Sequence, residues 1–318
     1  MIMMVGLPGS GKSTFAKEIR VRKYISDDLY IPSCPFIHSS DAIRKELYGD
    51  ESIQDDPQKV FSELHRRIKT DLGNGFDVVY DATNISKKRR IAFLSELKNI
   101  RCCPVCVVMA VPFSICMARN SKRERNVPAD VLSRMLRNYE PPHYSEGFRY
   151  IHYDFSAISA DDDGGIHTID NYFKRANPFD QENGHHSLTL GEHSTKAAEY
   201  IQMHDPDNFN LLIASMLHDN GKLYTKTRRN SRGEDDGNCH YYQHHCVGAY
   251  YSMFYLISDD NKFSENDITY ITNLIYYHMH PYRQWHDSER VKKRDYNLLG
   301  RRIFKDIMLL HEADVNAH

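Results

Sequence analysis

The stretch Gly6-Leu7-Pro8-Gly9-Ser10-Gly11-Lys12-Ser13-Thr14 decides the fold expected for the first half of the chain. It fits the pattern GxxxxGK[ST], in which glycines let the backbone curl so that its N–H groups face a phosphate. An apolar run, Ile2 to Val5, precedes the stretch, and a helical pattern begins at Phe15 after it. These flanks favour a phosphate-binding loop, or P-loop, over a simple glycine turn before a helix.

Each conserved position of the pattern has a defined task, so the loop predicts bound ATP and Mg²⁺. The lysine reaches the β- and γ-phosphate oxygens, and the hydroxyl that follows it binds Mg²⁺. We expect the nucleotide to contact Gly6, Gly9, Gly11, Lys12, Ser13 and Thr14, with Ser13 also on the metal.

Short apolar runs alternate with longer stretches of helical spacing through residues 1–155. The runs expected as strands are Ile2 to Val5, Pro35 to His38, Asp77 to Tyr80, Pro104 to Val111 and Tyr150 to Tyr153. Residues 57–72 and 87–97 carry helical spacing. The alternation predicts an α/β domain whose parallel sheet is flanked by helices.

Two of these strands end in polar groups that could serve an acceptor. Asp41 follows the second strand and could accept a hydroxyl proton, while Arg44, on the same helical face, could hold a phosphate of the acceptor. Asp81 ends the third strand with Asn84 close behind it, and could bind Mg²⁺ through water or orient the acceptor. For both aspartates, capping of the helix that follows is the alternative.

A run of cations, Arg119-Asn120-Ser121-Lys122-Arg123-Glu124-Arg125, precedes a helix that begins at Pro128. Arginines on a closing lid would neutralise charge on a transferred phosphoryl group, although such runs are also common on solvated surfaces. Together with residues 87–90 and Arg101 they form a local basic excess that would suit a phosphodiester chain.

The order of these elements resembles the phage-type polynucleotide 5′-kinases over about residues 1–155. The resemblance implies Lys12 and Ser13 at the nucleotide and Asp41 as general base. It further implies Arg44 at the acceptor phosphate and Arg119 and Arg123 as lid arginines. Some small-molecule P-loop kinases also have an Asp-Ala-Thr-Asn strand end and a lid, so the kinase chemistry is more secure than the substrate.

Histidine usage changes near residue 184, since five of the 18 histidines precede it and thirteen follow. Turn residues and an acidic run at residues 161–165 lie before this change. We therefore expect a first domain at 1–155, a linker at 156–182 and a second domain at 183–318. Segments near 191–204, 207–219, 242–257, 265–278 and 296–316 have helical spacing, and no alternating strand is evident, which predicts an all-α second domain.

Metal-ligand residues occur on separate predicted helices of this second domain. His218-Asp219 ends an apolar helix and is followed by Asn220-Gly221-Lys222, in which Gly221 would let Lys222 turn toward a bound phosphate. The remaining members of the set are His193, His244, His278 and Asp314. Ligands on different helices can converge on an interior metal of an α-bundle. The role of His186 stays open.

This order of ligands resembles the HD-superfamily metal-dependent phosphohydrolases over about residues 183–318. The resemblance implies one metal held by His193, His218, Asp219 and Asp314. It implies a second metal held by His244 and His278 and bridged by Asp219, with Lys222 stabilising the anion formed during hydrolysis. Imidazole and carboxylate ligands suit Mn, Fe, Co, Ni or Zn, so one or two divalent transition metals are expected.

A kinase joined to a phosphohydrolase suggests an enzyme that processes nucleic-acid ends for a downstream ligase. The first activity would phosphorylate a 5′-hydroxyl, and the second would remove a 3′-, 2′- or 2′,3′-cyclic phosphate, with RNA favoured. Two alternatives remain: a nucleoside or sugar kinase fused to a nucleotide phosphohydrolase, and a regulatory module in which ATP controls the HD domain.

Composition limits the other function classes. The net charge of −2 gives no global basic field, so any polyanion site must be local. The longest apolar stretch, 105–118, is interrupted by Pro112 and is too short to span a bilayer. Residues 1–5 lack the features of a signal peptide. We therefore expect a cytoplasmic enzyme with no membrane partner.

Overall fold

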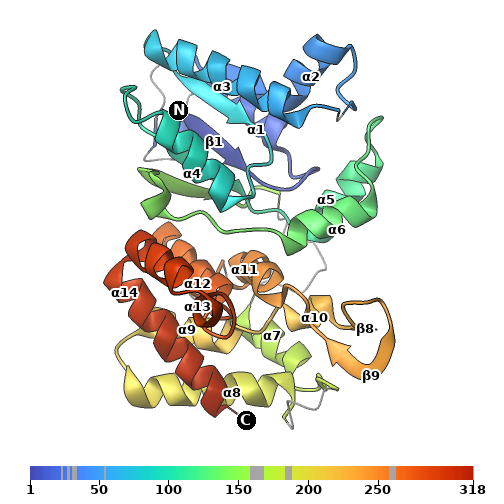
Figure 1. Cartoon of the computed structure of the whole chain (residues 1–318), viewed down its shortest axis with the longest axis vertical. Coiled ribbons are helices and arrows are strands. Elements are labelled where there is room, and N and C mark those ends of the chain that lie inside the picture. Colours follow the sequence, from blue (N-terminus) through green and yellow to red (C-terminus); the bar gives the residue numbers. More distant parts are fainter. Residues whose placement is uncertain are drawn as a thin grey trace. The chain divides into compact units, whose positions relative to one another are not determined.

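The structure is a computed structural model, and it describes residues 1–22, 24–26, 29–30, 34–53, 55–157, 168–182, 188–257 and 263–317. The chain divides into two compact units (Figure 1). The first comprises Met1–Met135 and Pro142–Ala160, and the second comprises Leu136–Pro141 and Asp161–His318. Within the described ranges, no helix has both the length and the apolar character needed to cross a bilayer.

The first unit is built on a five-stranded parallel sheet with the strand order β4-β5-β1-β6-β7. Its strands are β1 (Ile2–Val5), β4 (Phe36–Ser39), β5 (Val78–Asp81), β6 (Val105–Met109) and β7 (Tyr150–Asp154). The three central strands β1, β5 and β6 contain no exposed residue. Burial on both faces is characteristic of a parallel sheet covered by helices, so the α/β prediction for this unit is confirmed.

Helices follow the strands in the order that the sequence pattern predicts. They are α1 (Lys12–Arg22), α2 (Ser40–Tyr48), α3 (Pro57–Gly73), α4 (Lys87–Glu96), α5 (Phe113–Ser121) and α6 (Ala129–Arg137). A short antiparallel pair, β2 (Tyr24–Ser26) with β3 (Leu29–Tyr30), and a 3-10 turn, η1 (Tyr144–Glu146), complete the unit.

The sheet brings the polar strand ends together at one edge. β1 lies between β5 and β6, so the P-loop leaves the centre of the sheet. In the neighbouring pair β4 and β5, Ser39 is the register partner of Asp81. The segments that carry Asp41 and Asp81 therefore leave the sheet side by side, at the carboxyl edge where ligands of open parallel sheets bind.

The second unit is mainly helical. Its helices are α7 (Ile169–Ala176), α8 (Leu190–His204), α9 (Phe209–Leu217), α10 (Lys222–Thr225), α11 (His244–Tyr255), α12 (Glu265–Tyr277), α13 (Gln284–Asp287) and α14 (Glu289–Asn316). α8, α9, α12 and α14 pack against one another, and α11 packs on α12. Capping boxes begin α8 at Thr189 and α12 at Ser264, where a side-chain oxygen accepts from the backbone of the first turn.

The expectation of an all-α second domain is wrong in one respect. An antiparallel hairpin, β8 (Thr227–Arg229) and β9 (Asp235–His240), lies between α10 and α11. Its residues are polar and mostly exposed, so they carry no alternation of apolar and polar side chains. A hairpin held by backbone pairing outside the core leaves no hydrophobic signal in the sequence.

The range expected as a linker contains a packed helix. Within residues 156–182, α7 has Tyr172 fully buried, and the Tyr172 hydroxyl lies 2.7 Å from Ser194 Oγ on α8. Gln181 is also fully buried. These residues belong to the helical unit, whereas the acidic run that suggested a connector lies outside the described residues.

Candidate functional site

The P-loop follows β1 and depends on glycine at two positions. Gly9 and Gly11 have φ angles of 82° and 88°, in the left-handed region that side chains disfavour. A Cβ on Gly9 would lie 2.3 Å from the carbonyl oxygen of Cys116 in α5, so a close approach of backbones adds to the conformational demand. A cavity of about 430 Å³ lies over this loop, and residues 9–14, Arg119 and Arg123 are among those that line it.

Lys12 lies at the first position of α1 with its ammonium turned back onto the loop. Its Nζ donates to the carbonyl oxygens of Gly6 and Leu7 at 3.0 and 2.8 Å. Burial lowers the pKa of Lys12 from its usual value, against the attraction of Asp81. The Lys12 Nζ is therefore held by loop carbonyl oxygens at the point where a phosphate group could replace them.

Ser13 and Asp81 form the contact that a magnesium site in this fold requires. The Ser13 hydroxyl donates to Asp81 Oδ2 at 2.6 Å, which joins α1 to the end of β5. P-loop proteins hold Mg²⁺ with the loop Ser or Thr and an aspartate at a strand end, so this donor set fits the ion. Asp81 caps no helix, because the residue that precedes α4 is Ser86.

Asn84 is turned toward the sheet backbone and away from the P-loop cavity. Its Nδ2 donates to the carbonyl oxygens of Met4 and Ala82 at 2.9 and 3.4 Å, and its φ is 45°. The residue lines a different cavity, between α3 and α4. Its expected role beside Asp81 in the nucleotide and metal site stays a prediction, while its hydrogen bond to β1 is structural.

The predicted lid, residues 119–125, begins in the last turn of α5 and continues into the segment before α6, where the buried Asn120 closes a loop. Asn120 Nδ2 donates to the carbonyl oxygen of Val127 at 2.8 Å, and Asn120 Oδ1 accepts from the Val127 amide at 3.0 Å. This clamp folds residues 121–126 into a loop. Arg119 and Arg123 line the P-loop cavity, where their charges could meet a nucleotide.

Asp41 lies between two arginines. Arg44 Nη1 donates to Asp41 Oδ1 at 2.6 Å, and Arg125 Nη1 from the lid lies 3.2 Å from the same oxygen. Ser39 caps α2, since its side chain accepts from the Asp41 amide, so the alternative that Asp41 is the cap does not hold. Among the described residues, the buried Nε of Arg44 has no hydrogen-bond partner.

One residue of the predicted basic excess, Arg90, does not lie on the surface. Arg90 is fully buried and donates from Nε and Nη2 to both carboxylate oxygens of Glu146 at 2.7 Å. The bidentate pair joins α4 to η1 and cannot reach a phosphodiester chain. Helical spacing alone could not distinguish Arg90 from its exposed neighbours Lys88 and Arg89.

In the second unit, all six predicted metal ligands converge on one point. Ligand atoms of His193, His218, Asp219 and Asp314 lie within 4.8 Å of one another, and those of Asp219, His244 and His278 do the same. Asp219 belongs to both groups. The residues come from α8, the end of α9, α11, the end of α12 and α14.

The hydrogen bonds of the four imidazoles leave one nitrogen of each aimed at this cluster. Every Nδ1 lies 2.6 to 3.1 Å from a backbone carbonyl oxygen, which can only accept, so Nδ1 must carry the proton. Carbonyl partners of this kind commonly orient histidines that bind metals.

The Nε2 atoms of the four histidines lie in two close pairs, and in each pair a positive charge is required between the two nitrogens. Nε2 of His193 lies 3.1 Å from Nε2 of His218, and Nε2 of His244 lies 3.2 Å from that of His278. Two lone pairs at this distance repel unless a proton or a metal ion lies between them. Against the effect of burial, hydrogen bonds to Asp219 and Asp314 raise the pKa of His193 to about 9. The cluster therefore fits a divalent cation.

Lys222 and Gly221 support the cluster from one side. Lys222 Nζ lies 2.7 Å from Asp219 Oδ2 and donates to Gln181 Oε1 at 2.8 Å. Although burial favours the neutral acid, Lys222 and His218 hold the pKa of Asp219 well below its usual value. Gly221 has an ordinary φ of −62°, so it provides no special turn; instead, its missing Cβ admits the backbone of α11.

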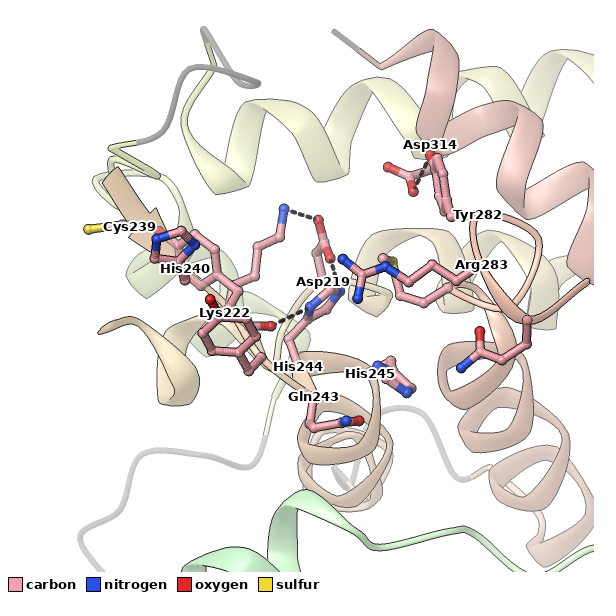
Figure 2. A pocket seen from close by; sticks show the side chains of 14 residues that line it. Asp219, Lys222, Cys239, His240, Gln243, His244, His245, Tyr282, Arg283 and Asp314 are labelled. Atoms are coloured by element: carbon pink, nitrogen blue, oxygen red, sulfur yellow. Dashed lines mark hydrogen bonds and ion pairs between the residues drawn. The ribbon is translucent and has the colours of Figure 1, made fainter. Parts of the chain in front are cut away.

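A cavity of about 750 Å³ opens onto the cluster and reveals residues that the sequence did not single out. Figure 2 shows the Arg283 guanidinium pointing toward Asp219 from the side opposite Lys222. Arg283 is exposed and forms no ion pair with any residue that the structure describes. Tyr282 donates its hydroxyl to Asp314 Oδ2 at 2.9 Å. Both follow His278 in a turn, a position without periodic signal. His186 lies outside the described residues.

Three comparisons with known proteins match part of the chain. A family model described as an AAA domain matches residues 1–142. L-seryl-tRNA(Sec) kinase of Methanococcus maripaludis is 28% identical over 143 residues, which are 45% of this chain and 53% of that protein. Protein kti12 of Schizosaccharomyces pombe is 26% identical over 151 residues, with coverages of 45% and 52%. The chain thus spans about half the length of these curated relatives.

A kinase is among the solved structures that are similar to part of the chain. A gluconokinase from Sinorhizobium meliloti 1021 has 19% sequence identity, covers 48% of this chain and 79% of its own, and gives a TM-score of 0.31. From the P-loop geometry, the family match and the seryl-tRNA kinase relative, the first unit is a P-loop kinase-like domain, for which ATP and Mg²⁺ are the implied ligands.

Proposed function

We propose that the chain is a two-activity enzyme that processes nucleic-acid ends. A kinase domain at residues 1–155 transfers the γ-phosphoryl group of ATP to a 5′-hydroxyl. A metal-dependent phosphohydrolase domain at residues 183–318 removes a 3′-, 2′- or 2′,3′-cyclic phosphate. RNA is the favoured substrate, and a ligase would join the processed ends.

The observation that carries the kinase half is the group formed by Asp41, Arg44 and Arg125. Asp41 lies one strand away from the Ser13–Asp81 pair, at the same edge of the sheet. Its carboxylate accepts the proton of the acceptor hydroxyl, because a side chain 42% exposed can be reached by a substrate. The unpartnered Nε of Arg44 then donates to a phosphate of the acceptor, and Arg125 can add a second cation.

The arginines of the lid serve two different substrates: some face the ATP site and one faces the acceptor site. Arg119 and Arg123 lie over the P-loop and neutralise charge that develops on the transferred group. Arg125 faces Asp41 instead. An acceptor with its own phosphate, such as a polynucleotide, uses such an arrangement better than a neutral sugar does. The relative named L-seryl-tRNA(Sec) kinase likewise has an RNA-borne substrate.

The phosphohydrolase half is supported by the His and Asp cluster. A divalent cation bound by these residues would polarise a phosphoryl oxygen and lower the pKa of water. Lys222 stabilises negative charge beside Asp219, and Arg283 is positioned to bind the remaining phosphoryl oxygens from the opposite side (Figure 2). The carbonyl partners of the four Nδ1 atoms keep every Nε2 directed at the cluster.

Phosphate transfer to a 5′-hydroxyl oligonucleotide tests the kinase half. Labelled ATP, Mg²⁺ and RNA or DNA oligonucleotides are supplied to the wild type, to Asp41→Asn and to Glu51→Gln. Glu51 is the matched control, since its carboxylate also lies near Arg125, at 3.8 Å. We expect Asp41→Asn to lower transfer by about 10² to 10⁴-fold and Glu51→Gln to leave it nearly unchanged.

Other outcomes of that assay identify the rival functions. Faster transfer to nucleosides or sugars than to oligonucleotides would replace the proposal with a small-molecule kinase. Transfer to no acceptor, with hydrolysis that depends on ATP, would indicate a regulatory module.

A further inference from the structure

A second cavity in the first unit, of about 550 Å³, lies between the first turns of α3 and α4. It falls in the size range of small-ligand sites. The residues of its walls that matter here are Phe61, His65, Tyr80, Thr83, Asn84 and Arg89. None of them lines the P-loop cavity, and no ligand has so far been assigned to this second cavity.

The rim of the cavity adjoins the reacting groups. The carbonyl oxygen of Thr83 accepts from the Gly6 amide at 3.0 Å, which ties the rim to the start of the P-loop. Two residues earlier, Asp81 accepts from Ser13. Because Ser39 and Asp81 are register partners, the segment carrying Asp41 leaves the sheet beside this rim. A molecule whose hydroxyl lies at Asp41 could therefore extend into the cavity.

Three aromatic rings, those of Phe61, His65 and Tyr80, line the cavity. The His65 ring packs against Phe93 at a tilt of 33° with ring centroids 4.2 Å apart, and it meets Tyr80 edge-on at 5.7 Å. Burial lowers the pKa of His65, so the ring is neutral at neutral pH. The guanidinium of Arg89 lies over the Phe61 ring, 6.0 Å from its centre. Arg89 is exposed and has no ion pair within the described part of the chain.

A side-chain hydrogen bond holds the rim in place. Asn84 has a φ of 45°, in the left-handed region that asparagine tolerates better than most residues, and its side-chain amide donates to the carbonyl oxygen of Met4 at 2.9 Å. Such conformations carry a cost and tend to occur where a ligand site needs a fixed shape. The rim therefore offers a preformed edge.

We propose that this cavity binds the nucleobase of the nucleotide that carries the acceptor 5′-hydroxyl, an inference that rests on the proposed kinase function. Aromatic faces and guanidinium planes are the surfaces on which proteins stack unpaired bases. With the base between Phe61, His65 and Arg89, the sugar lies at Thr83 and the hydroxyl faces Asp41. Stacking accepts any base, so the subsite selects nucleotides without selecting sequence.

Two 5′-hydroxyl RNA oligonucleotides test the subsite, one intact and one whose 5′-terminal nucleotide lacks its base. We expect a KM about tenfold lower for the intact oligonucleotide, the size of one stacking contact, with similar kcat. Phe61→Ala should raise the KM of the intact oligonucleotide about tenfold and leave that of the abasic one unchanged. Arg89→Ala should act in the same direction and, being exposed, should fold. Lys98→Ala is the matched control, because Lys98 is an exposed cation just after α4, outside the cavity wall and outside the predicted basic excess.

The outcomes separate the subsite from the kinase. Equal KM values for the two oligonucleotides with the wild-type protein, or an equal loss on both in Phe61→Ala and Arg89→Ala, would overturn the subsite and leave the kinase standing. Transfer to neither oligonucleotide would overturn both.

Discussion

The two candidate sites of this chain are built in opposite ways. The P-loop site is made by nine consecutive residues and by strand ends of one sheet, so its anion-binding groups are mainly backbone amides. The His and Asp cluster is made by side chains from five helices spread over more than 120 residues, from His193 to Asp314. The first depends on local conformation, whereas the second depends on the packing of the whole bundle.

This difference predicts how each site fails. A substitution in the loop should remove one activity and leave the fold intact. A substitution that alters helix packing should remove the other activity even when the substituted residue provides no ligand atom. The predictions below test this contrast, beginning with the largest effect.

Lys12→Ala should lower phosphate transfer on the order of 10³-fold, because it removes the cation that contacts the transferred group. The phosphohydrolase rate and thermal unfolding should not change. Steady-state assays of both activities measure this, with the exposed Lys17→Ala as control on the same helix. A parallel loss of both activities would contradict independent sites.

Gly221→Ala should destabilise the helical unit by about 3 kcal/mol, near the upper end of what overpacking costs. A Cβ there would lie 2.0 Å from the carbonyl oxygen of His244, a residue of the cluster. Gly248→Ala is the matched control across the same contact, since its nearest neighbour would be 3.3 Å away. Chemical unfolding and metal content of both variants measure the effect. Equal stability of the two would show that close packing at Gly221 is unimportant.

Arg283→Ala should raise the KM of the phosphohydrolase about 10 to 100-fold, the value of a hydrogen bond to a charged group. The metal content should stay unchanged, because Arg283 is positively charged and is not one of the metal ligands. Arg283→Lys should recover part of the loss. Loss of metal in Arg283→Ala would mean that the residue supports the cluster and does not bind substrate.

Tyr282→Phe should have the smallest effect. It removes one hydrogen bond to Asp314, and partners of metal ligands contribute about tenfold to metal affinity. Competition with a chelator measures the change. His311→Ala is a control on α14, since its ring contacts Tyr282 at 4.3 Å without bonding to Asp314 in the described structure. An affinity equal to that of the wild type would assign Tyr282 no role at the cluster.

The same contrast explains what could be predicted from the sequence. The strands β1 and β5 and the P-loop follow from contiguous patterns, because the local geometry and the residue types coincide. Packing contacts were not predictable. Nothing in the order of residues indicates that Arg90 pairs with Glu146 inside the unit, or that Asn84 turns toward β1.

In the helical unit, the ligand set was expected from its order and residue types, and the structure brings its members together. Arg283 and Tyr282 were missed because they lie in a turn, where side-chain direction depends on tertiary structure. The hairpin β8–β9 was missed because polar, exposed strands carry no hydrophobic alternation.

The central claim is that one chain acts on both kinds of end, and a single substrate tests it directly. An RNA with a 5′-hydroxyl and a 2′,3′-cyclic phosphate is incubated with ATP, Mg²⁺ and a divalent transition metal, and its products are weighed by mass spectrometry. The account predicts a gained 5′-phosphate that Lys12→Ala abolishes. It also predicts that one water opens the cyclic phosphate to a monoester and a second releases inorganic phosphate, and that Asp219→Ala abolishes both steps. An RNA recovered with either end unchanged would contradict it.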